Sequence, residues 1–260
     1  MCRLLAFRST VARSEPIALC GAEHSLAAQS RRDARGESHV DGWGLASFAT
    51  EGQPRITKSL GAAFEDPVFA ELAHSTTATT LVAHVRQASV GSNSLNNTHP
   101  FALGRWVFVH NGTLENFAAR KAELLAAIPD DLRGMIRGDT DSEHVFYFWL
   151  GHLRAATGRL NEPIDAETLS SSLRQTVQPL ELWFPPHDGE ISKFNLVITD
   201  GRMLGATRWG HGLSCRESAA AGRVVYIASE PTDGDGWREV PDRSLLVIDE
   251  HLDVHSASLT

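Results

Sequence analysis

The sequence opens with Met1-Cys2-Arg3-Leu4-Leu5-Ala6-Phe7, which predicts an apolar strand headed by a cysteine. Removal of the initiator Met is favoured when the second residue is small, and the mature chain would then begin with Cys2. A cysteine in that place carries a thiol and a free α-amine whose pKa values lie close together, near ~8.5 and ~8. Nucleophile and general base would thus reside in one residue. The alternative is that Cys2 is a small buried side chain of the strand, since cysteine is often fully buried.

The composition is that of a globular protein, with 42% hydrophobic and 22% charged residues, and we expect a single domain over residues 1–260. A net charge of −8 argues against a nucleic-acid or anionic-membrane partner, because such a surface would be repelled. Arg8 interrupts the first apolar run, which argues against a secretory signal, and no run approaches the ~18 residues of a membrane span. Cys2, Cys20 and Cys215 form neither a disulfide framework nor a metal knuckle, so we expect a reducing, cytoplasmic location.

Hydrophobic periodicity predicts strands in the first part of the chain, helices in the middle and strands again at the end. Asp66 is expected to cap a helix that begins at Pro67, and Asp200-Gly201 is typical of a hairpin turn. Because strands and helices do not alternate strictly, the pattern favours antiparallel sheets packed with helices, an α+β fold. The expected strands span 2–8, 45–49, 79–85, 106–109, 194–199, 203–208, 224–229 and 245–249, and the expected helices span 22–32, 65–74, 113–128, 141–156 and 166–177.

Polar residues of complementary type follow two of these strands. Arg86 ends the strand over 79–85, and a guanidinium is well shaped to hold a carboxylate through two hydrogen bonds. Asn111 and Gly112 end the next strand, where an amide group and an exposed backbone N–H would suit an oxyanion hole. Taken singly, each has an ordinary explanation, namely a surface arginine after a strand and a common Asn-Gly turn.

Asp141 stands at the start of the helix expected over 141–156 and has the charge to bind an ammonium group. The ordinary explanation is an acid at a helix N-terminus, beside a capping box formed by Thr140 and Glu143. Taken together, a thiol nucleophile, a carboxylate-binding arginine, an ammonium-binding aspartate and an oxyanion hole describe a site for an α-amino acid with a side-chain amide.

Six short motifs connect these residues into one pattern. They are Met1-Cys2-Arg3-Leu4-Leu5, Asp41-Gly42-Trp43-Gly44, His84-Val85-Arg86-Gln87-Ala88, Asn97-Thr98-His99-Pro100-Phe101, His110-Asn111-Gly112 and Gly138-Asp139-Thr140-Asp141-Ser142-Glu143. In this order they resemble the class II glutamine amidotransferases, the N-terminal-nucleophile (Ntn) hydrolases with a terminal cysteine. The small standalone members, of YafJ type or from the ergothioneine pathway, are the most similar. The resemblance implies a four-layer αββα sandwich of two antiparallel sheets flanked by helices, which agrees with the expected elements.

The resemblance also implies a role for each residue singled out above. Cys2 corresponds to the nucleophile, with its own α-amine as the base, and Asn111 and Gly112 correspond to the oxyanion hole. Arg86 would bind the α-carboxylate of the substrate and Asp141 its α-ammonium group.

Four further positions lie near this predicted site. Ser89 takes the place of a substrate-contacting Thr in the family, and His99 that of a supporting His before Pro. Arg3 and Gln87 depart from the pattern, since synthase-fused members have Gly after the nucleophile and an aromatic residue after the arginine. Both departures flank the proposed pocket, and Gln87 is counted among the predicted substrate-binding residues. The resemblance therefore implies a γ-glutamyl half for the substrate and leaves the identity of the amine half open.

The reaction implied is hydrolysis of glutamine or another γ-glutamyl small molecule through a γ-glutamyl thioester on Cys2. Retained Met1 would block this reaction, because the amine base would be missing. Two alternatives stay open, namely a glutaminase subunit that supplies ammonia to a separate synthase and a non-catalytic protein that binds a glutamyl ligand. No cofactor is expected, since nucleotide-binding motifs are absent and the 12 histidines show no metal-ligand spacing.

Overall fold

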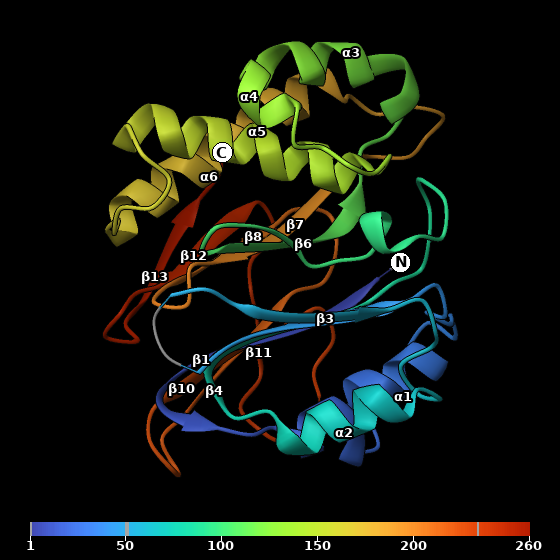
Figure 1. Cartoon of the computed structure of the whole chain (residues 1–260), viewed down its shortest axis with the longest axis vertical. Helices are drawn as coiled ribbons and strands as arrows, with labels where there is room; N and C mark the ends of the chain where they lie inside the picture. Colours follow the sequence, from blue (N-terminus) through green and yellow to red (C-terminus); the bar gives the residue numbers. More distant parts are fainter. Residues whose placement is uncertain (1, 50–51, 233) are drawn as a thin grey trace.

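Two antiparallel sheets lie face to face between two layers of helices (Figure 1). The structure is a computed structural model that describes residues 2–49, 52–232 and 234–260. It confirms the expected α+β sandwich of two antiparallel sheets with flanking helices.

The first sheet is built around β1 (Arg3–Arg13), which lies between β4 (Ala78–Val85) and β10 (Val224–Ala228). Leu5 pairs with Ala83 on one side and with Ala228 on the other, both antiparallel. The strand that follows Cys2 is therefore an interior strand, paired along both edges. Within the described residues the order is β11-β9-β10-β1-β4-β2-β3, the other members being β2 (Trp43–Phe48), β3 (Arg55–Ser59), β9 (Ser214–Ser218) and β11 (Arg238–Glu239).

The second sheet contains the hairpin that the sequence predicts at Asp200-Gly201, which joins β7 (Lys193–Thr199) to β8 (Leu204–Arg208). Oδ1 of Asp200 accepts the backbone N–H groups of residues 202 and 203, and Gly201 has a φ of 87°, which glycine adopts without strain. In the described part of the chain the order is β13-β12-β8-β7-β6-β5, with β5 (Phe101–Leu103), β6 (Trp106–Thr113), β12 (Ser244–Ile248) and β13 (Val254–Ser258).

Each sheet carries helices on its outer face (Figure 1). The predicted cap of α2 is confirmed, since Oδ1 of Asp66 accepts the N–H of Val68 and Pro67 opens the helix. The first sheet is covered by α1 (Leu26–Arg31) and α2 (Pro67–Ser75), with a π-helical turn, η1 (Ile17–Gly21). The second is covered by α3 (Phe117–Ala127), α4 (Asp130–Arg133), α5 (Asp141–Thr157) and α6 (Ala166–Trp183), and a 3₁₀ turn, η2 (Leu95–Asn97), precedes β5.

Two helices begin four residues later than the sequence predicts (26 − 22 and 117 − 113). The helix expected over 113–128 begins only at Phe117, because β6 continues through Thr113, which pairs with Lys193 of β7. The helix expected over 22–32 is shorter, since Ser25 caps α1 by accepting the N–H of Ala28.

Alternation along the strands decides which side chains face the gap between the sheets. In β1, Leu4 and Ala6 belong to the core between the sheets, whereas Leu5 and Phe7 pack in the core on the α1 and α2 side. Val107 and Val109 of β6 also face the core between the sheets. By the same period of two, residues 2 and 111 face this gap as well.

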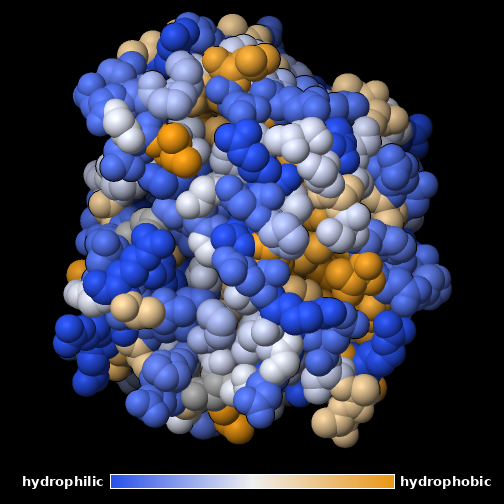
Figure 2. Space-filling model, turned by 180° about the vertical axis from the view of Figure 1, so that it is seen from behind, coloured by the Kyte–Doolittle hydropathy of each residue, from blue (hydrophilic) through white to orange (hydrophobic). Residues whose placement is uncertain are grey.

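The outer surface is largely polar. Figure 2 shows one face on which apolar residues gather in a single hollowed band and are otherwise scattered among polar ones. None of the helices in the described ranges combines the length and the apolar character that crossing a bilayer requires.

Candidate active site

Three of the predicted site residues meet at one end of the gap between the sheets. Arg3 of β1 is paired with Val85 of β4, so Cys2 and Arg86 stand side by side where the two strands meet. Asn111 comes from β6 of the opposite sheet and has the same alternation as the inward-facing Val107 and Val109. Cys2, Arg86 and Asn111 are thus brought together from positions up to 109 residues apart (111 − 2).

Cys2 is partly exposed, and its Sγ donates a hydrogen bond to the backbone oxygen of Gln87 at 3.5 Å. Burial raises the pKa of the Cys2 thiol, and the positive charge of Arg86 opposes part of that shift. The thiol is therefore held protonated near neutral pH and needs a base before it can attack. Met1, whose retention the sequence predicts to be inhibitory, lies outside the described residues.

Arg86 is only 3% exposed and carries an unsatisfied donor. Its Nη2 donates to the backbone oxygen of Val90 at 3.1 Å, whereas its Nη1 is buried with no partner among the described residues. A buried guanidinium nitrogen without an acceptor is costly, and a substrate carboxylate would supply the acceptor. Nearby, Ser89 is exposed, and its hydroxyl lies 3.1 Å from Oγ1 of Thr113.

Asn111 and Gly112 lie inside β6 and not in a turn, so the ordinary explanation from sequence does not hold. Asn111 is 1% exposed, and its Oδ1 has no hydrogen-bond partner in the part of the chain that is described. A Cβ at Gly112 would collide with the backbone oxygen of Lys193 and with Nε2 of His110, so only glycine fits here. The pair therefore offers an unpaired amide oxygen, which is a hydrogen-bond acceptor, beside a backbone kept free of a side chain.

Asp141 is buried at the first position of α5 and is tied into the fold by both oxygens. Its Oδ2 accepts the N–H of Leu114 at 2.8 Å, and its Oδ1 accepts the N–H of Ser142 at 2.7 Å. His110 links the start of α5 to β7, because its Nδ1 lies 3.0 Å from Oγ of Ser142 and its Nε2 donates to the backbone oxygen of Lys193 at 2.9 Å. Oδ1 of Asp141 also accepts from Oγ of Ser142 at 3.2 Å. Asp141 therefore stands beside β6 in a fixed orientation, and Oδ2 keeps a second lone pair for a ligand.

The predicted capping box is half correct. Oγ1 of Thr140 accepts the N–H of Glu143 at 3.2 Å, as expected. The carboxylate of Glu143 does not return to Thr140; it accepts the N–H groups of Arg137 and Gly138 at 3.0 and 2.6 Å. Through these two bonds the glutamate fixes the loop that leads into α5.

His99 is buried away from solvent and packs on other rings. Its ring centroid lies 4.2 Å from that of His84 and 4.7 Å from that of Phe101. Burial lowers the pKa of His99 well below its usual value and that of His84 to about 3, so both rings are neutral. A Cβ at Gly44 would collide with the backbone oxygen of His99, which explains a glycine of the Asp41–Gly44 motif. These contacts are those of a supporting residue, and substrate contact by His99 stays a prediction.

A buried charge network around Arg3 was not predicted. Arg3 donates from Nη1 to the backbone oxygen of Cys2 at 2.9 Å, from Nη2 to Asp33, and from Nε to Glu230 at 3.1 Å. Nε2 of His39 lies 3.0 Å from Asp33, and burial together with the charge of Arg3 lowers the pKa of His39 to about 4. The sequence singled out Arg3 only as a departure, because partners 30 and 227 residues away leave no local signal.

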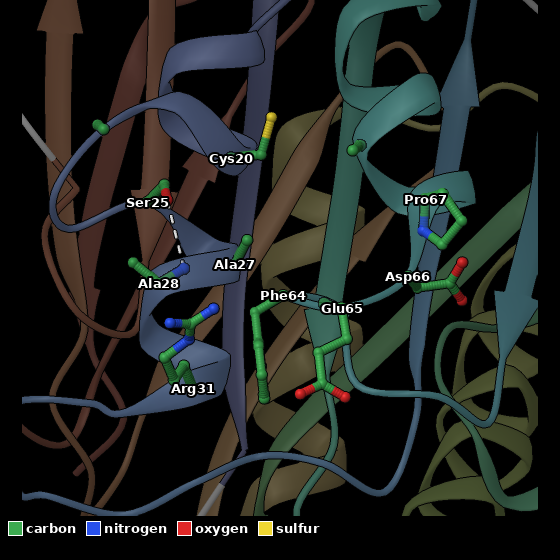
Figure 3. Close-up of a pocket in the computed structure, with 12 residues that line it drawn as sticks. Cys20, Ser25, Ala27, Ala28, Arg31, Phe64, Glu65, Asp66 and Pro67 are labelled. Carbon is green, nitrogen blue, oxygen red and sulfur yellow. Dashed lines mark hydrogen bonds between the residues drawn. The ribbon is translucent and has the colours of Figure 1, made fainter.

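The structure contains one cavity that adjoins the site and another that lies away from it, on the outer face of the first sheet. A cavity of about 470 Å³ lies between α1 and α2, where Ser25 and Asp66 serve as helix caps and Cys20 and Phe64 line the wall (Figure 3). None of the predicted site residues lines it. A cavity of about 390 Å³ is lined by Arg3 and Asn111 and so adjoins the site. Across the described positions no group of three or more His, Cys, Asp or Glu side chains is placed to hold a metal ion.

Comparison with known proteins agrees with this fold. The family model described as glutamine amidotransferases class-II matches residues 1–216. "Probable glutamine amidotransferase DUG3" of Saccharomyces cerevisiae is 28% identical over 293 residues, which cover 95% of this chain and 82% of that protein. "Gamma-glutamyl-hercynylcysteine sulfoxide hydrolase" of Mycolicibacterium smegmatis is 28% identical over 85% of this chain and 84% of its own. A solved class-II domain protein from Silicibacter pomeroyi shares the fold over 100% of both chains, with a TM-score of 0.69 at 19% identity. The chain therefore belongs to the class II glutamine amidotransferases and is an enzyme.

Proposed function

We propose that this chain is a cysteine-dependent amidohydrolase that cleaves the side-chain amide of glutamine or of a γ-glutamyl small molecule. The Cys2 thiolate attacks the γ-carbonyl carbon, and ammonia or an amine leaves with the proton that the thiol gave up. Water then hydrolyses the γ-glutamyl thioester, which releases glutamate and restores the thiol. The α-amine of Cys2, freed by removal of Met1, is the base in this scheme.

The observation that carries the proposal is the meeting of Cys2 with two buried polar groups that lack partners. Nη1 of Arg86 and Oδ1 of Asn111 are both inaccessible to solvent and unpaired among the described residues. Leaving the Arg86 donor unsatisfied costs about 1–3 kcal/mol, which a substrate carboxylate would offset. Oδ1 of Asn111 is an acceptor and would take an N–H of the substrate, so the donor toward an oxyanion would be Nδ2 of the same amide. Arg86 and Asn111 both stand at the end of the gap where Cys2 precedes β1.

Each of these residues is assigned to one chemical group of the substrate. Arg86 binds the α-carboxylate, and Asp141 accepts hydrogen bonds from the α-ammonium group. Asn111 and the backbone N–H of Gly112 stabilise the oxyanion of the tetrahedral intermediate, a contribution typically worth about 2.7–4 kcal/mol per donor in related chemistry. The glutamyl half is also expected to contact three further substrate-binding residues, Ser89, Gln87 and His99.

The test is covalent labelling with 6-diazo-5-oxo-norleucine, a glutamine-mimicking electrophile, followed by intact mass and peptide mapping. We expect one adduct on Cys2 of a chain that lacks Met1, none on a Cys2→Ala variant, and an unchanged adduct on a Cys20→Ala variant. Glutamine or γ-glutamyl amide hydrolysis should be lost in Cys2→Ala with the fold retained by circular dichroism. A fully active Cys2→Ala variant would refute the mechanism.

A further inference from the structure

The two residues proposed to bind the α-amino acid end of the substrate belong to separate loops. Arg86 follows β4, and the loop after it continues to η2. Asp141 opens α5 and follows the loop over residues 134–140. In an α-amino acid the carboxylate and the ammonium group share one carbon atom. Arg86 and Asp141 can therefore bind both groups of one molecule only when the two loops keep a fixed spacing.

Asn97 joins these two loops through its side-chain amide. Nδ2 donates to the backbone oxygen of Ser92 at 2.9 Å and to its Oγ at 3.3 Å, and Oδ1 accepts the backbone N–H of Asp139 at 2.8 Å. Ser92 lies six residues after Arg86 (92 − 86), and Asp139 lies two residues before Asp141 (141 − 139). A carbonyl needs a donor and an N–H needs an acceptor, so the backbone partners fix the orientation of the amide.

The link made by Asn97 is buried and held in place. Asn97 is 1% exposed, and its own N–H donates to the backbone oxygen of Ser94 at 3.0 Å, at the end of η2. Any displacement of the loop after Arg86 also reaches the guanidinium, because Nη2 donates to the backbone oxygen of Val90 at 3.1 Å, two residues before Ser92. The position of the guanidinium therefore depends on the bond between Asn97 and this loop.

The loop before α5 is the better anchored of the two. The carboxylate of Glu143 accepts two backbone N–H groups of that loop, and Oδ2 of Asp141 accepts the N–H of the residue that follows β6. In the loop after Arg86, residues 91–93 are exposed and lie outside any helix or strand. Asn97 therefore ties a loop with few supports to one that is already fixed.

Two glycines leave room for the side chain of Asn97. A Cβ at Gly91 would stand 2.8 Å from Nδ2, and a Cβ at Gly138 would collide with Oδ1. Gly91 belongs to the loop after Arg86, and Gly138 belongs to the loop before α5. Each loop is thus shaped around this amide, an observation that is independent of the hydrogen bonds and agrees with them.

We propose that Asn97 is a positioning residue that holds the loop after Arg86 against the loop before Asp141. It thereby sets the geometry in which one ligand is bound by its α-carboxylate and its α-ammonium group together. The inference rests on the proposed function. The side-chain hydrogen bonds of Asn97 among the described residues go to Ser92 and Asp139 alone, so its loss weakens recognition of the α-amino acid end and leaves the thiol as reactive as before.

Two reagents that label Cys2 test the inference. 6-Diazo-5-oxo-norleucine carries an α-amino acid end, whereas iodoacetamide alkylates thiols and has no such end. Asn97→Ala removes all three hydrogen bonds and leaves space in which water can reach the stranded backbone groups. We expect this variant to react at least about tenfold more slowly with 6-diazo-5-oxo-norleucine, because misplacement by about 1 Å can cost a hundredfold in rate. Its rate with iodoacetamide, measured at Cys2 by peptide mapping, should change by less than about twofold, since a residue that supports only the fold would alter both rates alike.

Asn96→Ala is the matched control. The side chain of Asn96 is exposed and forms no hydrogen bond with the part of the chain that the structure describes, so this variant should change neither rate. If circular dichroism shows Asn97→Ala to be unfolded, Asn97→Asp takes its place. At about pH 8 its carboxylate keeps the acceptor for Asp139 and removes the donor to Ser92, and the same difference between the two reagents is expected.

The outcomes separate the two proposals. An unchanged rate with 6-diazo-5-oxo-norleucine in the folded variant, or an equal loss with both reagents, would overturn the role of Asn97 while labelling of the wild-type chain upholds the proposed function. Absence of Cys2 labelling by 6-diazo-5-oxo-norleucine in the processed wild-type chain would overturn the proposed function and this inference with it.

Discussion

Replacement of Arg3 by Met should damage both stability and reactivity, because Arg3 joins three separate segments beneath the nucleophile. The substitution keeps an unbranched side chain in place of the aliphatic part of arginine and removes the hydrogen bonds to Cys2, Asp33 and Glu230. Asp33 would stay fully buried with only His39 and the backbone N–H groups of residues 35 and 37, each at about 2.9–3.0 Å.

Breaking a buried ion pair by removing one partner typically costs about 3–5 kcal/mol. Asp33 keeps three donors, and Glu230 is only partly buried, so the lower end applies here and we expect a loss of about 3 kcal/mol. The backbone of Cys2 would also lose its donor, and misplacement of a nucleophile by about 1 Å can cost a hundredfold in rate. We therefore expect labelling of Cys2 by 6-diazo-5-oxo-norleucine to slow by about tenfold or more.

The assay is urea denaturation followed by fluorescence, with the labelling rate measured on the same samples. Arg120→Met is the matched control, because Arg120 forms only an exposed ion pair with Glu123, and its loss should change stability by no more than about 0.5 kcal/mol. If Arg3→Met costs less than about 1 kcal/mol and leaves the labelling rate unchanged, the network does not position Cys2 and this reasoning is wrong.

Two further predictions concern stability. Stability should fall as pH is lowered from about 7 toward 4, because burial depresses the pKa of His39 to about 4 and that of His84 to about 3; the unfolded chain then takes up protons near ~6.5 that the folded chain does not. Equal free energies of unfolding at pH 7 and pH 5 in urea titrations would contradict this. Asp66→Ala should cost about 2 kcal/mol in the same assay at pH 7, since Asp66 caps α2 and also accepts from Nε1 of Trp43 at 2.9 Å, whereas Asp66→Asn should recover part of that loss. A loss below about 0.5 kcal/mol would show that these bonds contribute little.

Features with local causes could be predicted from the sequence. The start of α2 follows from Asp66 and Pro67, and the β7–β8 turn from Asp200 and Gly201, because cap and turn preferences act over a few residues. The places of Cys2 and Arg86 at strand ends could also be predicted, whereas Asn111 lies inside β6, which continues to Thr113. That these residues would meet rested on the family resemblance. The pairing of β1 with β4 places Cys2 beside Arg86, and Asn111 reaches them from the second sheet, which packs face to face on the first.

Features with distant causes could not be predicted. The start of α3 is set by Lys193, which keeps Thr113 in β6 and lies 80 residues away (193 − 113). Glu143 turns to the backbone of residues 137 and 138, because the loop before α5 folds back on its side chain. The Arg3 network and the cavity beside it depend on Glu230, and no period or motif in the sequence joins these positions.

The placement of β1 between β4 and β10 has a consequence for biosynthesis. The N–H of Leu4 cannot bond to Oγ of Ser229 until the ribosome has synthesised 225 more residues. At 5–20 residues per second this delay is roughly 10–45 s of translation. Until then one edge of β1 exposes unpaired N–H and C=O groups, which invite pairing with other chains. A fragment trimmed to the matched residues 1–216 would lack β10 altogether and keep that edge open permanently. Expression of this protein in shortened form is therefore a route to aggregation, however well the retained part matches its family.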